Sequence, residues 1–253
     1  DTDRSRGLGD VYKRQLYIFD SLEGAPVVDL SNVEVNLNNT SYIYVTDPET
    51  QEETIVKELY SGQNREWVSY DQIPEMLVNV TIAAEDKRFL EHHGVDWLRT
   101  IRSTLGYFGG SSRVQGGSTI TQQVIKNLTG NDEVTPERKV QEIFTALKLE
   151  KNFSKEQIME TYLNIAFFSN QCYGIQSASK LYFNKDISEL NVAEAATLIA
   201  ITNAPTKYNP LRMNANEDYG WRTGMEENKE RRDYILEAVS YTHLRAHETD
   251  QYL

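Results

Sequence analysis

Two glutamates in this chain lie where a carboxylate could take part in acid–base chemistry. The first, Glu85, ends the segment EMLVNVTIAAE and is followed directly by Asp86. Apolar residues recur in that segment at the spacing of one helix face, so we expect Glu85 at the rim of an apolar surface. A carboxylate in such a place is partly desolvated, which suits a proton acceptor. A solvated helix end would show the same pattern, so both interpretations stay open at this point.

The second glutamate, Glu142, has two cationic neighbours at helical spacing. Arg138 and Lys139 precede it by one helical turn, so the three side chains share one face of a helix. An exposed helix with ordinary ion pairs would look the same, and each pair would contribute only about 0.3–0.5 kcal/mol. The same segment carries apolar residues at helical spacing: Val140, Ile143, Phe144 and Leu147. We therefore expect the charged trio to lie beside a buried apolar stripe.

A polar segment with two glycines, RVQGGSTITQQVIKN, could bind an anion. Gly116 and Gly117 permit a close approach of the backbone, and hydroxyl side chains follow them where a helical stripe begins at Ile120. Free backbone N–H groups at a helix start attract negative charge. Further cations flank helix starts or apolar runs, namely Lys126, Lys155, Arg231 and Arg232. Together these features favour a ligand that carries phosphate.

The composition argues against several other kinds of protein and site. A formal net charge of −12 argues against a nucleic-acid partner. The single cysteine, Cys172, can form neither an internal disulfide nor a thiolate metal cluster. No run approaches the roughly 18 apolar residues of a membrane span. Two motif matches are interpreted as chance: the zinc-like pair His243 and His247, and the S-x-x-K pair Ser177 and Lys180.

The order of patterns along the chain predicts a mainly helical protein with a small β-containing N-terminal segment. Strand and turn patterns occupy residues 16–60, first in LYIFDSLEGAPVVDL and then in a hairpin around Pro48. From Pro74 to about Val239 the apolar spacing is helical. Residues 1–15 and 240–253 show neither pattern and are interpreted as non-native sequence. The predicted boundaries are therefore 16–72 for the β-containing segment and 73–239 for the helical domain.

Five segments in this order resemble the motifs of peptidoglycan glycosyltransferases, glycosyltransferase family 51: EDKRFLEHHG, GGSTITQQVIKN, ERKVQE, KEQIMETYLN and ERRDYIL. That module occurs in class A penicillin-binding proteins and in monofunctional transglycosylases. The resemblance covers about Ile73 to Val239, and five motifs in one order make it specific. The residues before it resemble the linker that joins a membrane anchor to this module. Met159 and Cys172 depart from the pattern, but neither replaces a charged group.

The resemblance implies a lysozyme-like, two-lobed helical fold and an enzyme that polymerises lipid II into β-1,4-linked glycan strands with release of undecaprenyl pyrophosphate. Glu85 matches the general base that acts on the acceptor 4-hydroxyl, and Glu142 matches the second catalytic glutamate. The other matched positions imply substrate binding by Asp86, Phe89, His92, Ser118, Thr119, Gln122, Gln123, Lys126, Asn127, Arg138, Lys139, Lys155, Tyr162, Asn164, Arg231 and Arg232.

The family also implies a setting for this reaction. The expected location is the extracytoplasmic face of a bacterial cytoplasmic membrane, with an anchor missing from this chain. The implied partners are lipid II, the growing lipid-linked glycan, the membrane surface and a transpeptidase domain absent from this chain. The segment around Trp97 is the part expected to lean on the membrane. A Mg or Mn ion at the pyrophosphate is compatible with the resemblance, and no organic cofactor is expected.

Reaction chemistry supports this interpretation and defines two alternatives. A pyrophosphate leaving group needs positive charge and no proton donor, which accounts for several cations around one base. A glycoside hydrolase would need a general acid for a sugar leaving group, so a lysozyme-like hydrolase or lytic transglycosylase is the first alternative. A wall-binding scaffold without catalysis is the second. Attack opposite the leaving group would invert an α-linked donor to a β-1,4 bond.

Overall fold

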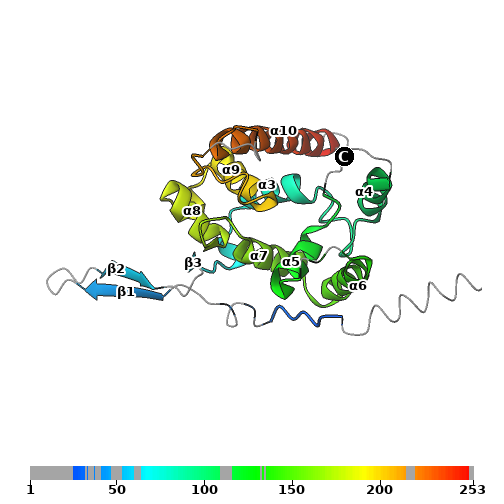
Figure 1. Cartoon of the computed structure of the whole chain (residues 1–253), viewed down its shortest axis with the longest axis horizontal. Coiled ribbons are helices and arrows are strands. Elements are labelled where there is room, and N and C mark those ends of the chain that lie inside the picture. Colours follow the sequence, from blue (N-terminus) through cyan, green and yellow to red (C-terminus); the bar gives the residue numbers. More distant parts are fainter. Residues whose placement is uncertain are drawn as a thin grey trace, which may run out of the picture. The chain divides into compact units, whose positions relative to one another are not determined.

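The computed structural model describes most of the chain and divides it into two compact units. The described residues are 25–31, 33, 37, 41–46, 53–59, 64–108, 116–131, 133, 135–214 and 220–250. Among them, unit 1 contains residues 25–30 and Phe89–Ile158, and unit 2 contains Ser31–Arg88 and the chain from Met159 onward. Figure 1 shows that helices are the main elements of both units.

Unit 1 is built from α4 (Trp97–Phe108), α5 (Ile120–Thr129), α6 (Pro136–Asn152) and the start of α7 (Lys155–Ile165). Its helix ends follow from local chemistry. Helix α5 begins at a capping box, in which Thr119 accepts from the Gln122 backbone N–H and the Gln122 side chain accepts from the Thr119 backbone N–H. It ends at Gly130, whose φ of 64° is the left-handed conformation that glycine adopts without strain.

Unit 2 combines two small sheets with helices. Strands β1 (Ser41–Thr46) and β2 (Glu53–Leu59) pair antiparallel, and the short strands β3 (Asn64–Arg65) and β4 (Cys172–Tyr173) pair in parallel. Its helices are α3 (Glu75–Glu85), the rest of α7, α8 (Ile175–Phe183), α9 (Val192–Asn203) and α10 (Gly224–Asp250), with 3-10 turns η1 (Tyr70–Gln72) and η2 (Ile187–Glu189).

The core of unit 2 is centred on α9, which packs against both α3 and α10. The side chains of α9 from Ala195 to Ile201 are almost all buried, so this helix is apolar on most of its surface. It begins at a capping box between Asn191 and Glu194. The Lys185 ammonium, followed by the Asn191 backbone N–H, lowers the pKa of Glu194. The apolar run VAEAATLIAIT therefore forms a buried helix.

The prediction of a mainly helical, two-lobed chain with a small β-containing N-terminal part is confirmed. The hairpin around Pro48 is also confirmed, as β1 and β2. Residues 25–30 do not form the predicted strand, and residues 1–24, which include the rest of that predicted pair, lie outside the described residues. Helix α10 continues past the expected end at Val239 to Asp250. The side chains of His243 and His247 lie outside the described residues.

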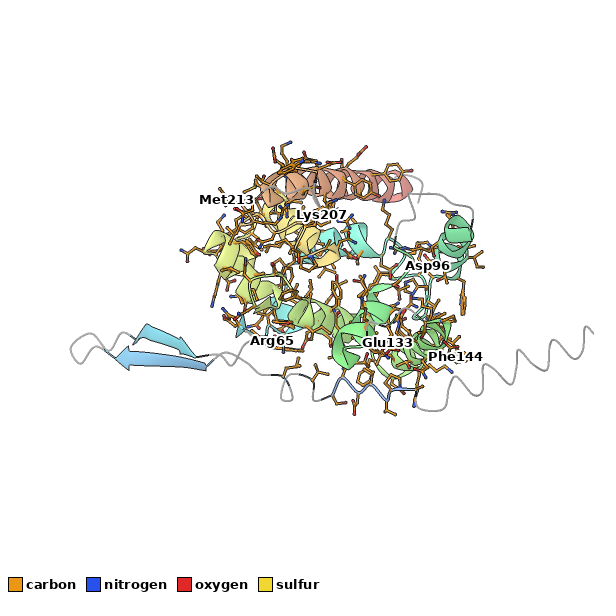
Figure 2. The ribbon with its side chains drawn as sticks, viewed as in Figure 1. Arg65, Asp96, Glu133, Phe144, Lys207 and Met213 are labelled. Carbon is orange, nitrogen blue, oxygen red and sulfur yellow. The ribbon has the colours of Figure 1, made fainter. Side chains whose placement is uncertain are left out.

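The apolar stripe predicted for α6 is wrong in its position. Its buried residues are Glu142, Thr145, Ala146 and Leu149, whereas Phe144 is 43% exposed, and Figure 2 shows it on the outside of the helix. The cause is a close backbone contact: a Cβ added at Gly94 would lie 2.5 Å from the Ala146 carbonyl oxygen. Since the backbone at Gly94 lies against the small residue Ala146, the face of α6 around Ala146 is buried, whereas Phe144 is exposed.

Candidate functional site

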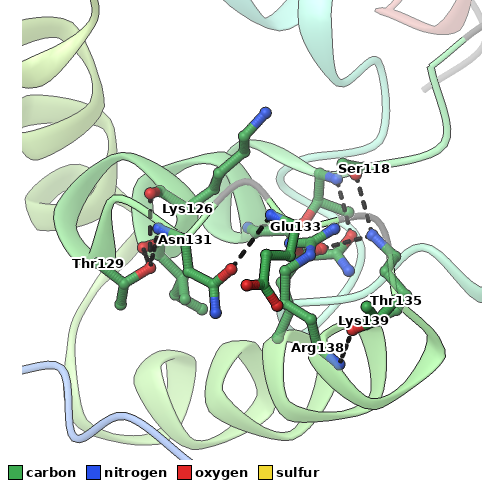
Figure 3. Close-up of polar contacts among 12 residues, drawn as sticks. Ser118, Lys126, Thr129, Asn131, Glu133, Thr135, Arg138 and Lys139 are labelled. Atoms are coloured by element: carbon green, nitrogen blue, oxygen red, sulfur yellow. Dashed lines mark hydrogen bonds and ion pairs between the residues drawn. The ribbon is translucent and has the colours of Figure 1, made fainter.

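In unit 1, Glu142 lies at the centre of a buried charged cluster on α6. Its side chain is 5% exposed, one carboxylate oxygen pairs with Arg138 and the other pairs with Lys139. The Lys139 ammonium also donates to the Ser118 hydroxyl at 3.0 Å, as drawn in Figure 3. Arg138 is aligned by the start of the helix, where its backbone N–H donates to the Thr135 hydroxyl. The predicted trio therefore forms, and the glycine-rich segment joins it through Ser118.

A pocket of about 230 Å³ opens beside this cluster. Its lining combines apolar, polar and charged residues: Pro26, Ile125, Lys126, Thr129, Asn131, Arg138, Gln141 and Glu142. Figure 3 shows the Lys126 side chain extending away from the other side chains drawn. Among the described residues no ion pair is formed by Lys126. A free ammonium beside a guanidinium is a suitable arrangement for a phosphate oxygen.

The residues of this cluster do not fit a protein-held divalent ion. Both oxygens of Glu142 already contact cations, which would repel a metal. Within the described part of the chain, no group of three or more His, Cys, Asp or Glu side chains could hold a metal ion. Magnesium and manganese prefer carboxylate and other oxygen ligands. The Mg or Mn ion stays a prediction, and no step of the reaction below is assigned to it.

The start of α5 uses part of the predicted anion site for its own fold. Thr119 is fully buried, and its hydroxyl donates to the Gly94 carbonyl at 2.7 Å. Gln122 is also buried and completes the capping box with Thr119. Gln123 is half-buried, and the side chains of Lys126 and Asn127 are exposed. Thr119 and Gln122 thus support the segment, whereas Ser118 reaches the charged cluster and Ile125 and Lys126 line the pocket.

Lys155 forms a second cluster in unit 1. Its ammonium pairs with Glu150 at 2.7 Å, donates to the His92 carbonyl at 2.7 Å and lies 4.4 Å from the centre of the Phe89 ring. Thr121 donates its hydroxyl to the other Glu150 oxygen. Because Phe89 is 1% exposed, its contacts are with the protein interior. Phe89, His92 and Lys155 are therefore brought together, and their contacts fix the chain between α3 and α4.

In unit 2, Glu85 ends α3 and faces α9 and α10. Its side chain is buried, and its Oε1 lies 3.3 Å from the Thr202 hydroxyl of α9 and 3.8 Å from Arg231 Nη2 of α10. The Tyr162 hydroxyl, from α7, lies 3.5 Å from the Thr202 hydroxyl. Burial, and then the Glu85 charge, raises the pKa of Tyr162 well above its usual value. The predicted residues Glu85, Tyr162 and Arg231 therefore meet, with Thr202 between two of them.

The remaining predicted residues of unit 2 have other contacts. Asp86 is fully buried directly after α3. Asn164 is fully buried as well, and its amide binds the backbone of Val68 in both directions, at 2.9 and 2.7 Å. Arg232 donates to the neighbouring Asp233. Asn164 thus attaches the segment before α3 to α7, a supporting role that its position in a motif did not suggest.

The S-x-x-K match is confirmed as ordinary helix packing. Ser177 is 3% exposed within α8, whereas the Lys180 ammonium is exposed and pairs with Glu66 at 2.6 Å. A nucleophilic serine needs a base within hydrogen-bond reach, and neither residue has the other as a partner.

Sequence reasoning missed two residues that the structure places in these clusters. Glu150 neutralises Lys155, and it could have been found as the acidic residue one helical turn before the next predicted helix. Thr202 reaches Glu85 from the end of α9. The available signal was a hydroxyl within the last turn of an otherwise apolar helix, directly before Asn203.

Comparisons with known proteins support the family resemblance of the five sequence motifs. The family model described as Transglycosylase matches residues 52–240. Penicillin-binding protein 1F of Bacillus subtilis (strain 168) is 42% identical over 181 residues, which cover 72% of this chain and 24% of that protein. Penicillin-binding protein 1A of Aquifex aeolicus (strain VF5) is 45% identical over 149 residues, covering 59% of this chain and 20% of that protein.

A solved structure also matches. The crystal structure of penicillin-binding protein 1A from Haemophilus influenzae gives a TM-score of 0.40 at 20% identity, over 80% of this chain and 18% of that one. The chain spans about a quarter or less of the length of these relatives. Because the family model covers well over half of the residues, the chain belongs to the transglycosylase family.

Proposed function

We propose that this chain is a peptidoglycan glycosyltransferase domain, which polymerises lipid II into β-1,4-linked glycan and releases undecaprenyl pyrophosphate. The observation that carries the proposal is the contrast between two buried glutamates. Glu142 pairs each carboxylate oxygen with a cation beside a pocket that a further ammonium lines, whereas Glu85 Oε1 lies 3.3 Å from the Thr202 hydroxyl and 3.8 Å from Arg231. The first arrangement suits an anion site and the second suits a proton acceptor.

Glu85 is proposed as the general base. The 4-hydroxyl of the acceptor sugar attacks the anomeric carbon of the donor, so the new O4–C1 bond forms as the bond from C1 to the pyrophosphate breaks. The hydroxyl proton passes to the Glu85 carboxylate and afterwards to water. A positioned base contributes about 10²–10⁴ in rate. Attack from the side opposite the leaving group inverts the anomeric configuration.

Lys126, Arg138 and Lys139 are proposed to stabilise the pyrophosphate that leaves. Negative charge grows on its oxygens as the glycosidic bond breaks, and fixed cations stabilise that charge without supplying a proton. Glu142 keeps Arg138 and Lys139 in place through its two ion pairs. A carboxylate that is engaged in this way suits a charge anchor better than the proton donor that a glycoside hydrolase requires. This is the observation against a lysozyme-like hydrolase.

The exposed face of α4 supports the proposed location at a membrane surface. Trp97, Leu98 and Ile101 are each more than half exposed there, and Arg99 and Arg102 lie on the same helix. Apolar and basic side chains on one exposed helix suit the interface of an anionic bilayer. Within the described residues, no helix combines the length and the apolar character that crossing a bilayer requires.

The proposal is tested by incubating the full chain with labelled lipid II in detergent and separating the products on a gel. A ladder of polymers that lysozyme collapses is the expected result, because lysozyme cleaves β-1,4-linked glycan. A folded protein that releases soluble fragments from purified cell wall, and forms no ladder, would favour the hydrolase. Tight lipid II binding with neither product would favour a scaffold.

A further inference from the structure

The hydroxyl of Thr202 lies within hydrogen-bond reach of both Glu85 and the backbone of its own helix. Its Oγ1 is 3.3 Å from Glu85 Oε1 and 2.9 Å from the Ile199 carbonyl oxygen. A threonine hydroxyl has one proton to donate and two lone pairs that accept. It can therefore donate to only one of these two oxygens at a time, and it can accept from another group at the same moment.

A general base needs a partner that tolerates both of its charge states. While Glu85 is a carboxylate, the Thr202 hydroxyl can donate to Oε1. Once Glu85 has taken the acceptor proton, the new carboxyl O–H can donate to Thr202 Oγ1, and the hydroxyl proton turns to Ile199. A cation as the sole partner would disfavour the protonated Glu85 carboxyl. Arg231 Nη2 lies 3.8 Å from Oε1, so it disfavours protonation less than a cation in a close ion pair would.

We propose that Thr202 is a positioning residue for the base Glu85, whose carboxyl it orients by alternating between donating to the carboxylate and accepting from the carboxylic acid. The inference rests on the proposed function, because the alternation matters only where Glu85 takes up and releases a proton. Charged and titratable groups near this carboxyl include Tyr162 from α7, Arg231 from α10, and Asp86 directly after α3.

Tyr162 supports the same hydroxyl from the other side. Its hydroxyl lies 3.5 Å from Thr202 Oγ1, and its raised pKa keeps it protonated and able to donate through the working range of pH. Since α7, α9 and α3 each contribute one member, the orientation of the carboxyl depends on the packing of three helices.

The test compares Thr202→Val, Thr202→Ser and the wild type, with Thr197→Val as a matched control. Valine keeps the shape of threonine and removes the hydroxyl, and serine keeps the hydroxyl. Thr197 is half-buried on the same helix, and its hydroxyl donates to the Ala193 carbonyl at 2.8 Å. Thr197→Val therefore removes an equivalent hydroxyl that has no contact with Glu85.

We expect Thr202→Val to lower kcat about 5- to 10-fold with little change in KM for lipid II, because one hydrogen bond to a charged group is lost. The acid limb of the pH–rate profile is expected to move to higher pH, since the charged form of the base loses a donor. Thr202→Ser and Thr197→Val should both keep the wild-type kcat and the wild-type acid limb of the pH–rate profile. An unaltered kcat and pH profile in folded Thr202→Val would overturn the inference.

A readout without turnover separates this inference from the proposed function. The pH titration of the Glu85 carboxyl carbon is followed by NMR in the full chain, with Glu85→Gln to assign the signal. Thr202→Val should move that titration to higher pH, and Thr197→Val should not. A wild type that forms no polymer would contradict the proposed function alone. An unmoved titration in Thr202→Val would contradict the inference, whatever the polymerisation assay gives.

Discussion

Glu85 and Glu142 are the same side chain in two different surroundings. Both are buried and both lie on helices, but each oxygen of Glu142 pairs with a cation, whereas Glu85 Oε1 lies 3.8 Å from Arg231 Nη2 and 3.3 Å from the Thr202 hydroxyl. The cations of Glu142 come from its own helix, one turn away. Thr202 and Arg231 reach Glu85 from two other helices, α9 and α10.

This difference is the basis of the two roles that we propose for these glutamates. Local ion pairs on one helix hold Glu142 as a fixed charge, since they depend only on helical spacing. In the proposed function, Glu85 is instead the carboxylate that takes up the proton of the acceptor hydroxyl. The contacts of Glu85 with Thr202 and Arg231 depend on the packing of α3, α9 and α10, so changes that leave α6 intact can disturb them.

The largest expected effect on stability comes from Gly94→Ala, which disturbs unit 1 and leaves the contacts of Glu85 intact. Gly94 has a φ of 87°, and a Cβ there would lie 2.5 Å from the Ala146 carbonyl oxygen. Strain and overlap together should lower the free energy of unfolding by about 3 kcal/mol or more. Gly130→Ala is the control, because Gly130 also has a positive φ, 64°, but a Cβ added there would have no atom within 4 Å. We expect this variant to lower the free energy of unfolding by about 1 kcal/mol. Denaturant titrations measure both, and equal losses would refute the close contact at α6.

Glu142→Gln should have the next largest effect, because it removes the charge that separates two cations. Arg138 and Lys139 are 18% and 33% exposed, so solvent compensates part of the loss. We expect the free energy of unfolding to fall by about 1–3 kcal/mol. Glu66→Gln, which breaks the more exposed pair with Lys180, should cost less than about 1 kcal/mol. If Glu66→Gln lowers the free energy of unfolding more than Glu142→Gln does, then Glu142 does not hold Arg138 and Lys139 in place.

A smaller effect is expected from Cys172, which reports on unit 2. Burial raises the pKa of this thiol to about 12 from an ordinary value near 9. A raised pKa in the folded state means that the thiol stabilises the fold fully below pH 9 and that this contribution is lost as the pH rises toward 12. The loss has a slope of up to about 1.4 kcal/mol per pH unit.

Stability measured by denaturant titration between pH 8 and 11 should therefore fall less steeply in Cys172→Ala than in the wild type. Tyr162 and Tyr182 also have raised pKa values through burial, so part of the alkaline loss remains in the variant. If the free energy of unfolding falls with pH equally steeply in the wild type and in Cys172→Ala, the Cys172 thiol is not desolvated by burial.

The fold and the charged residues could be predicted from the sequence to the extent that they depend on local spacing. The trio on α6, the hairpin at β1 and β2, and the start of α3 after Pro74 follow from periodicity, turns and helix-start rules. The position of the buried stripe on α6 was mispredicted, because the contact of Gly94 with Ala146 joins distant segments and leaves no periodic signal.

The same limit applies to the candidate site. Family motifs predicted Glu85, Tyr162 and Arg231, and the structure brings these side chains together. Thr202 could not be predicted, since a hydroxyl at a helix end is common and only the packing of α9 against α3 gives it a role. The supporting contacts of Asn164 and Lys155 are also tertiary, so motif membership did not distinguish support from substrate binding.

The most direct test of the two roles compares Glu85→Gln with Glu142→Gln, measuring both lipid II affinity and the rate of polymer formation in the full chain. The account predicts that Glu85→Gln binds lipid II like the wild type and polymerises about 10²–10⁴ times more slowly, because only the proton acceptor is lost. Glu142→Gln should weaken binding as well as rate, because its cations are no longer fixed. Polymerisation at the wild-type rate by folded Glu85→Gln would contradict the account.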